Sequence, residues 1–198
     1  LPLHMKGITE LVGDREDPSA VGTQIPALHW DTVIDFCAYK PMHIDIFLQH
    51  LKGQISQYIL ISTTSVYSCI NSLWQTEDAP LLDAPQQELG VFADYGYFKV
   101  RTEIALVQQA SKRGFDYCII RPAIIYGFYN YAPRESYFFD RVLAGDAVEV
   151  PLDQGVAYSF IWVVDMAHAL IKCLGNPLVT NQIFNLASDR AIGYPHII

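Results

Sequence analysis

Three short apolar runs, separated by segments with helical spacing, constrain the fold of this chain more than any other feature. The runs lie at residues 31–37, 57–62 and 116–121. Each is continuously apolar rather than alternating, which is typical of a strand buried on both faces of a sheet. Helical spacing covers residues 41–51 and 95–111 between them, and a glycine follows shortly after each segment. This β-α-β-α-β order predicts an α/β fold with a parallel sheet covered on both faces by helices.

Shorter elements are expected on both sides of this unit. A strand at 7–13 and a short helix that ends near Pro26 precede it. Beyond residue 122 the expected elements are helices at 135–144 and 164–174 and strands at 147–151, 158–163 and 182–187. Because this second pattern is shorter and less regular, we expect two domains: a sheet domain at residues 1–122 and a smaller mixed α/β lobe at residues 123–198.

The composition is that of a globular protein and argues against a nucleic-acid or membrane partner. Of the 198 residues, 51% are hydrophobic and 17% are charged, which supplies a core and argues against disorder. The formal net charge is −8 and the lysines and arginines are scattered, whereas a nucleic-acid partner calls for a basic patch. No apolar stretch reaches about 18 residues, so no membrane span is expected.

The four cysteines lie far apart in the sequence, at positions 37, 69, 118 and 173. No pair has the spacing of metal ligands, so no metal site is expected. Cys37 and Cys118 fall within apolar runs, and both are predicted to be buried thiols that pack as small hydrophobic side chains. Unpaired thiols predict a reducing, cytoplasmic compartment.

Tyr95 and Lys99 stand four residues apart in the predicted helix at 95–111, so their side chains share one helix face. A free tyrosine titrates near a pKa of about 10, too high for an effective base at neutral pH. A nearby cation stabilises the phenolate and lowers that pKa. The pair therefore has the geometry of a proton-transfer group, although an interfacial aromatic beside a solvated lysine has the same spacing.

Hydroxyl side chains follow the second apolar run, at Ser62, Thr63, Thr64 and Ser65. The carboxyl ends of parallel strands are where α/β sheets bind ligands. A turn without function would look similar, because serine and threonine are common at strand ends. The order of motifs is more specific: this cluster, then Tyr-Gly-x-x-Lys, then a buried strand that runs into Arg-Pro-x-x-x-Tyr-Gly.

With these motifs in this order, the chain resembles the extended short-chain dehydrogenase/reductase family, the NAD-dependent epimerase/dehydratase group. Four segments add to the resemblance: Gly-Asp-Arg-Glu-Asp at 13–17, Phe-Cys-Ala-Tyr at 36–39, Arg-Pro-Ala-Ile-Ile-Tyr-Gly at 121–127, and Phe-Ile-Trp-Val-Val-Asp-Met-Ala at 160–167. The resemblance covers nearly the whole chain. It implies a Rossmann-like, doubly wound parallel sheet with a small C-terminal substrate lobe, and NAD or NADP as the cofactor.

The resemblance also implies roles by position. Tyr95 moves a proton on a substrate hydroxyl or carbonyl, Lys99 lowers the pKa of Tyr95 and holds the nicotinamide ribose, and Thr63 orients the substrate oxygen. The residues implied to contact the cofactor are Asp14, Arg15, Cys37, Ala38, Tyr39, Ser62, Tyr95, Lys99, Pro122 and Ala123. Those implied to contact the substrate are Thr64, Ile124, Arg134 and Tyr158.

The sequence departs from the family pattern at the cofactor phosphates. No Gly-x-x-Gly-x-x-Gly turn occurs anywhere in the chain, and this turn is the part that cradles the pyrophosphate at a helix N-terminus. The chain is therefore expected to begin near the third strand of the family and to stop before the family's C-terminal end.

It also departs from the pattern at the substrate. Ile124 and Tyr158 stand where nucleotide-sugar members usually carry asparagine and a diphosphate-binding arginine, which weakens the case for a nucleotide-sugar substrate. Arg134 and Arg141 are candidate replacements for that arginine, although solvated or salt-bridged helix arginines fit the same positions. Thr64 and Ser65 stand where sugar dehydratases carry Asp-Glu, which argues against elimination of water.

The expected function is that of an NAD(P)-dependent oxidoreductase or epimerase acting on a hydroxyl or carbonyl group of a sugar-like or other small substrate. The alternative is a catalytically silent relative that serves as a regulatory or RNA-binding module. The complete set of Thr63, Tyr95 and Lys99 favours the enzyme, because a binding module does not need it. A homodimer through the two long predicted helices is implied by the resemblance alone.

Overall fold

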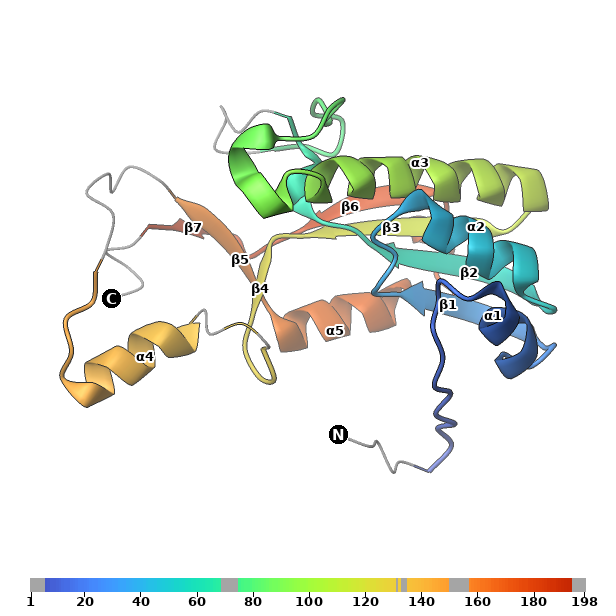
Figure 1. Ribbon diagram of the computed structural model, residues 1–198, viewed down its shortest axis with the longest axis horizontal. Coiled ribbons are helices and arrows are strands. Elements are labelled where there is room, and N and C mark those ends of the chain that lie inside the picture. The colour runs from blue at the N-terminus through green and yellow to red at the C-terminus, as the bar shows by residue number, and fades with distance from the viewer. Residues whose placement is uncertain (1–5, 69–74, 131, 133–134, 150–156, 194–198) are drawn as a thin grey trace.

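A computed structural model describes residues 6–68, 75–130, 132, 135–149 and 157–193 of the chain. Its centre is a parallel sheet with the strand order β1-β2-β3-β6 (Figure 1). The strands are β1 (His29–Asp35), β2 (Gln54–Ile61), β3 (Asp116–Pro122) and β6 (Gln182–Leu186). The predicted α/β class and parallel sheet are confirmed.

Helices cover both faces of this sheet. Helices α2 (Pro41–His50) and α3 (Tyr95–Arg113) lie on one face, and α5 (Val163–Cys173) lies on the other (Figure 1). Proline opens α2, and Gly114 ends α3 with a φ of 76°, a left-handed conformation that favours glycine. The other described helices are α1 (Pro18–Gln24), α4 (Glu135–Ala144) and the short 3₁₀ helices η1 (Thr64–Val66), η2 (Gln87–Phe92) and η3 (Pro177–Val179). None of the helices in the described ranges has both the length and the apolar character that crossing a bilayer requires.

Alternate residues of the central strands face the two helix layers. Tyr58 and Leu60 pack in the cluster that contains Leu106 of α3. Ile59 and Ile61, which alternate with Tyr58 and Leu60 along β2, pack in the cluster that contains Met166 of α5. The period of two along a strand therefore supplies both hydrophobic cores. It also explains why the apolar runs in β2 and β3 are continuous.

Three expectations about strands are wrong. β1 is only partly buried, because it lies at an edge of the described sheet with β2 as its neighbour. Residues 7–13 form no strand, since a strand needs a hydrogen-bonded partner and no described strand lies beside them. Residues 147–149 are not a strand either, and residues 150–151 lie outside the described ranges.

The cysteines divide between core and surface. Cys118 in β3 is buried, as predicted, and so is Cys173 in α5. Cys37 is exposed, contrary to prediction, because β1 ends at Asp35 and Cys37 falls in the turn that follows. Cys69 lies outside the described residues.

A smaller sheet with the order β4-β5-β7 continues from the main one. β4 (Ile124–Tyr126) follows β3 almost directly and pairs in parallel with β5 (Tyr158–Trp162), which pairs antiparallel with β7 (Ala191–Ile192). These strands and α4 (Glu135–Ala144) fall within the predicted lobe at 123–198. β6 and α5 come from the same segment but complete and cover the main sheet, so the division at residue 122 stays a prediction.

Candidate active site

The carboxyl ends of β1, β2 and β3 open into one cleft with a volume of about 660 Å³. Each strand contributes the segment that follows it: Tyr39 after β1, residues 62–65 after β2, and residues 122–127 at and beyond the end of β3. Tyr95 and Lys99, from the first turns of α3, complete the lining. The edge of a parallel sheet formed by its carboxyl ends is the general place for ligands in this architecture.

Most of the site residues predicted from the sequence line this cleft. They are Tyr39, Ser62, Thr63, Thr64, Tyr95, Lys99, Pro122, Ala123 and Ile124. Asp14 and Arg15 lie at a cavity beside β1, Cys37 and Ala38 lie in the turn after β1, and Tyr158 lines an adjoining cavity. Arg134 falls outside the described residues. Among the described residues, no three His, Cys, Asp or Glu side chains are grouped so as to hold a metal ion.

Gly96 lets α3 approach the end of β2. A Cβ at this position would stand 2.3 Å from the carbonyl oxygen of Ser65 and 2.7 Å from Cδ1 of Leu82. Because such contacts are far inside the van der Waals distance, any larger residue would push the helix away. The close approach made possible by glycine thus sets Tyr95 and Thr63 on the same cleft.

Lys99 is almost fully buried, with 1% of its surface exposed. Its Nζ donates hydrogen bonds to the carbonyl oxygens of Ala38, at 2.8 Å, and Ile61, at 2.7 Å. These bonds tie the turn after β1 to the end of β2. Burial lowers the pKa of Lys99 from 10.5 to about 8, although the carboxylates of Asp35 and Glu103 act in the opposite direction.

The depressed pKa of Lys99 predicts a pH dependence of stability. Between about pH 8 and 10.5 the unfolded chain binds a proton that the folded chain does not, so the free energy of unfolding rises with pH across this window. Each pH unit adds at most about 1.4 kcal/mol. Urea titrations should show this rise for the wild type and for Lys112→Met, an exposed control on the same helix. Lys99→Met should lack it, and identical pH profiles for wild type and Lys99→Met would contradict the assignment.

Tyr95, the first residue of α3, remains accessible from the cleft. Its side chain is 40% exposed, and its ring centroid lies 6.4 Å from that of Tyr39. The Tyr39 ring also lies 5.5 Å from the Lys99 ammonium, within the range of a cation–π contact. A substrate group can therefore reach the phenol, and Lys99, although almost fully buried, also lines the cleft.

Thr63 and Ser62 differ in how their hydroxyl groups are used. Ser62 Oγ donates a short hydrogen bond to Oε1 of the buried Glu103. Thr63 Oγ1 caps η1 by accepting from the Ser65 amide at 3.1 Å, and it donates to the Ser65 hydroxyl at 3.2 Å. The Ser62 proton is bound to a buried carboxylate, whereas the Thr63 proton goes to a neutral hydroxyl in a weaker bond. Thr63 is therefore the hydroxyl that can more easily turn to a substrate oxygen in the cleft.

A buried ion pair behind the cleft is a feature that the sequence reasoning misses. Arg121 in β3 donates to both carboxylate oxygens of Glu103 in α3, at 2.7 and 3.1 Å, and the two side chains are 1% and 4% exposed. Arg121 also donates to Tyr67 Oη at 2.9 Å, which donates in turn to Asn185 in β6 at 2.6 Å. Together with the bond from Ser62, this network connects the cleft to β6, the edge strand next to β3.

A sequence signal for this network exists. Glu103 follows Lys99 by four residues and Tyr95 by eight, so helical spacing places all three on one face of α3. An acidic residue on the face that packs against the sheet needs a partner, since an unpaired buried charge is costly. The arginine of the Arg-Pro motif at the end of β3 is that partner.

Asp35 anchors the turn after β1. Its carboxylate accepts two hydrogen bonds from Arg15, at 2.8 and 2.7 Å, one from Tyr58 Oη at 2.5 Å and one from the Cys37 amide at 2.9 Å. Burial opposes its ionisation, but the Arg15 guanidinium and the hydrogen bonds from Tyr58 and Cys37 together keep the pKa of Asp35 below its usual value. Both terminal nitrogens of Arg15 are engaged in this pair, so the predicted cofactor contact of Arg15 stays a prediction.

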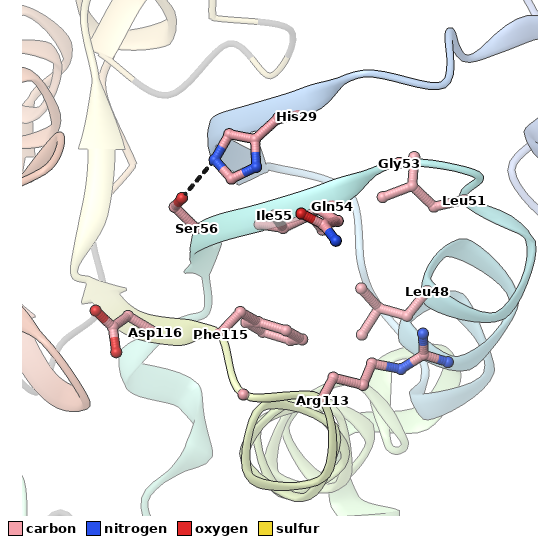
Figure 2. Close-up of a pocket in the computed structure, with 11 residues that line it drawn as sticks. His29, Leu48, Leu51, Gly53, Gln54, Ile55, Ser56, Arg113, Phe115 and Asp116 are labelled. Carbon is pink, nitrogen blue, oxygen red and sulfur yellow. Dashed lines mark hydrogen bonds between the residues drawn. The ribbon is translucent and has the colours of Figure 1, made fainter.

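A second cavity of about 660 Å³ lies at the opposite edge of the main sheet (Figure 2). It is lined by the first residues of three strands, His29, Gln54 and Asp116, and in Figure 2 the His29 ring is hydrogen bonded to Ser56 Oγ at 2.8 Å. None of the predicted site residues belongs to its described lining. The cleft at the carboxyl ends is therefore the candidate active site.

Comparison with known proteins identifies the family. A sequence profile of the NAD dependent epimerase/dehydratase family matches residues 41–187. The chain belongs to this family. The matched region runs from the start of α2 past the end of β6, and it includes Thr63, Tyr95 and Lys99. The resemblance inferred from the motifs is thereby confirmed.

The names of individual relatives of this epimerase/dehydratase family member describe different functions. It is 30% identical over 188 residues to the chloroplast stem-loop binding protein of 41 kDa b of Arabidopsis thaliana. The alignment covers 94% of this chain and 46% of the Arabidopsis protein. The chain thus spans about half the length of this relative. Two solved structures share the fold. RMD of Pseudomonas aeruginosa with NADPH superimposes with a TM-score of 0.77 at 19% identity, and the match covers 93% of this chain and 69% of RMD. UDP-glucose 4-epimerase of Thermotoga maritima with UDP-glucose superimposes with a TM-score of 0.71 at 20% identity, and the match covers 91% of this chain and 63% of the epimerase.

The cofactor of the family is NAD(P), and the residues present fit its nicotinamide half. Lys99 uses two of its three ammonium protons on backbone carbonyls, which leaves one for a ligand hydroxyl. The cleft beside it is lined by Tyr39 and residues 122–127 and is large enough for a small planar ring. The described residues offer no comparable cradle for the phosphates, and the given sequence contains no glycine-rich turn of the required spacing.

Proposed function

We propose that the protein is an NAD(P)-dependent oxidoreductase or epimerase that acts on a hydroxyl or carbonyl group of a sugar-like or other small molecule. The observation that carries this proposal is the cleft in which Thr63, Tyr95 and Lys99 meet. Family membership supports it, and so does the NADPH in the similar RMD structure. Tyr39, Pro122 and Ala123 are the proposed cofactor contacts within the cleft, and Thr64 and Ile124 the proposed substrate contacts.

The chain's own residues would handle the proton while the cofactor handles the hydride. A bound nicotinamide supplies the hydride acceptor or donor. When a substrate alcohol is oxidised, its carbon loses a hydride and its oxygen loses a proton, and Tyr95 takes that proton. Thr63 holds the oxygen during the transfer, and the positive charge of Lys99 favours the phenolate form of Tyr95. Reduction reverses these steps, and an epimerase performs both in turn on opposite faces of one carbon.

The test is a titration of the intact protein with NADH and with NADPH, followed by nucleotide fluorescence. We expect saturable binding of at least one of them. Lys99→Met should weaken this binding, because it removes the ammonium at the end of β2, whereas Lys112→Met on the exposed side of α3 should not. If neither nucleotide binds at millimolar concentration, the enzyme proposal fails.

A second candidate is the binding of a nucleic-acid stem-loop by a catalytically silent protein. The name of the Arabidopsis relative favours it. The net charge of −8 counts against it, because nucleic-acid affinity depends on neutralising phosphates with basic residues. Submicromolar binding of an RNA stem-loop, together with no binding of either nucleotide, would establish this candidate in place of the enzyme.

A further inference from the structure

The cleft that is lined by Tyr95 and Lys99 adjoins a separate cavity of about 670 Å³, which we call the distal cavity. The two share Ile124 and Tyr126 as lining residues. Both belong to β4, which begins one residue after Ala123 in the cleft. A substrate whose reacting group lies at Tyr95 can therefore extend along β4 into the distal cavity.

One face of the small sheet forms the floor of the distal cavity. In β5, Tyr158 and Phe160 line the cavity, whereas Ile161 between Phe160 and Trp162 is 4% exposed and packs in the core with α5. The ring of Phe160 meets that of Tyr126 edge to face, with centroids 6.0 Å apart. A sheet with one face on the core normally has polar residues on its other face. Here the outer face carries the aromatic side chains of Tyr158 and Phe160 instead, which is an apolar surface that a ligand could cover.

Helix α4 and the segment after β6 supply the walls. Phe138 and Phe139 of α4 line the distal cavity, and Phe139 is 61% exposed. Among the described lining residues, the charged ones are Glu135 and Arg190. Glu135 already accepts hydrogen bonds from the Gly127 amide at 2.8 Å and from Asn130 at 3.4 Å. Within this described lining, the exposed Arg190 is thus the cation that a ligand can reach.

We propose that the distal cavity binds an aromatic portion of the substrate that carries a single anionic group, and that Arg190 pairs with this group. The aromatic lining provides edge-to-face and stacking contacts for a flat ring. One arginine and one engaged glutamate leave the described part of the lining without net charge, which is unsuitable for the two phosphates of a nucleoside diphosphate. This inference rests on the proposed function only for the place of the reacting group, and it makes the substrate an aryl-substituted alcohol or ketone with one carboxylate.

The experiment is isothermal titration of the intact protein, without nucleotide, using 2-naphthoate, neutral 2-naphthylmethanol and UDP-glucose. We expect both naphthalenes to bind and UDP-glucose not to displace them. Arg190→Gln should lower the affinity for 2-naphthoate about tenfold and leave the affinity for 2-naphthylmethanol unchanged. The reason is that only the carboxylate of 2-naphthoate forms a charge-assisted hydrogen bond with the arginine. Ser188→Trp, a change at an exposed lining residue, should fill the cavity and weaken both. Arg101→Gln, an exposed change on α3, is the matched control.

The inference is overturned if neither naphthalene binds, if Arg190→Gln and Arg101→Gln behave alike, or if UDP-glucose displaces 2-naphthoate. These readouts are separable from the proposed function. Tyr95→Phe should bind 2-naphthoate as the wild type does, since Tyr95 does not line the distal cavity. If the naphthalenes bind but neither NADH nor NADPH does, the enzyme proposal fails and the proposal for the distal cavity stands. If a nucleotide binds but neither naphthalene does, the proposal for the distal cavity fails and the enzyme proposal stands.

Discussion

Replacing Tyr95 with phenylalanine is expected to lower kcat by a factor of about 10² to 10⁴, the usual contribution of general acid–base catalysis. The lower kcat results from removal of the phenolic oxygen alone, since the phenyl ring still fills the same space beside Tyr39 in the cleft. Nucleotide binding should be almost unchanged, because the hydrogen bonds of Lys99 to Ala38 and Ile61 do not involve the phenol. The measurement is the steady-state rate of reduction or oxidation at saturating cofactor and substrate, beside a nucleotide titration of the same variant.

Tyr97→Phe is the matched control for this change. It removes a phenolic oxygen from the same helix two residues away, at a half-buried position that does not line the cleft. Its kcat should equal that of the wild type within error. Retained turnover in Tyr95→Phe would refute the role of Tyr95, and an equal loss in Tyr97→Phe would show that the helix, rather than the proton transfer, had been disturbed.

The parts of the site that follow directly from the sequence are those set by local pattern. β2 and β3 are continuous apolar runs because both of their faces are buried, and this makes them recognisable without a structure. Parallel strands place their carboxyl ends at one edge, so residues that follow them are brought together by topology alone. That is why Thr63, at the end of β2, and Tyr95 and Lys99, at the start of the next helix, were predictable members of one cleft.

The features of the fold and the site that cannot be predicted from the sequence depend on contacts between residues far apart in the chain. Residues 7–13 have the composition of a strand, yet they have no described strand beside them to pair with. The distal cavity is formed by β4, α4, β5 and the residues around Arg190, and its shape depends on how these elements pack. The partnership of Glu103 with Arg121 joins positions in two elements, and only the packing of α3 against the sheet makes it visible.

Replacing Glu103 with glutamine is expected to destabilise the protein by about 3 kcal/mol or more, because it leaves the buried guanidinium of Arg121 without its counter-charge. Glutamine keeps the shape and one acceptor oxygen, so the loss reports the charge rather than a cavity. The loss should appear as a lower midpoint of urea unfolding with an unchanged slope. The same substitution removes a charge that raises the pKa of Lys99, so the window in which stability rises with pH should begin at a lower pH.

Two further variants separate the buried charge from a general effect of losing an ion pair. Asp146→Asn breaks the exposed pair of Arg141 and Asp146, whose atoms are 3.9 Å apart, and should cost less than about 1 kcal/mol. The double change Glu103→Leu with Arg121→Met removes both buried charges and should recover most of the stability lost in Glu103→Gln, since paired apolar replacement of a buried ion pair is often close to neutral. A double variant as unstable as the single one would mean that the hydrogen bonds of the pair to Ser62 and Tyr67, rather than its charge balance, hold the cleft against the sheet.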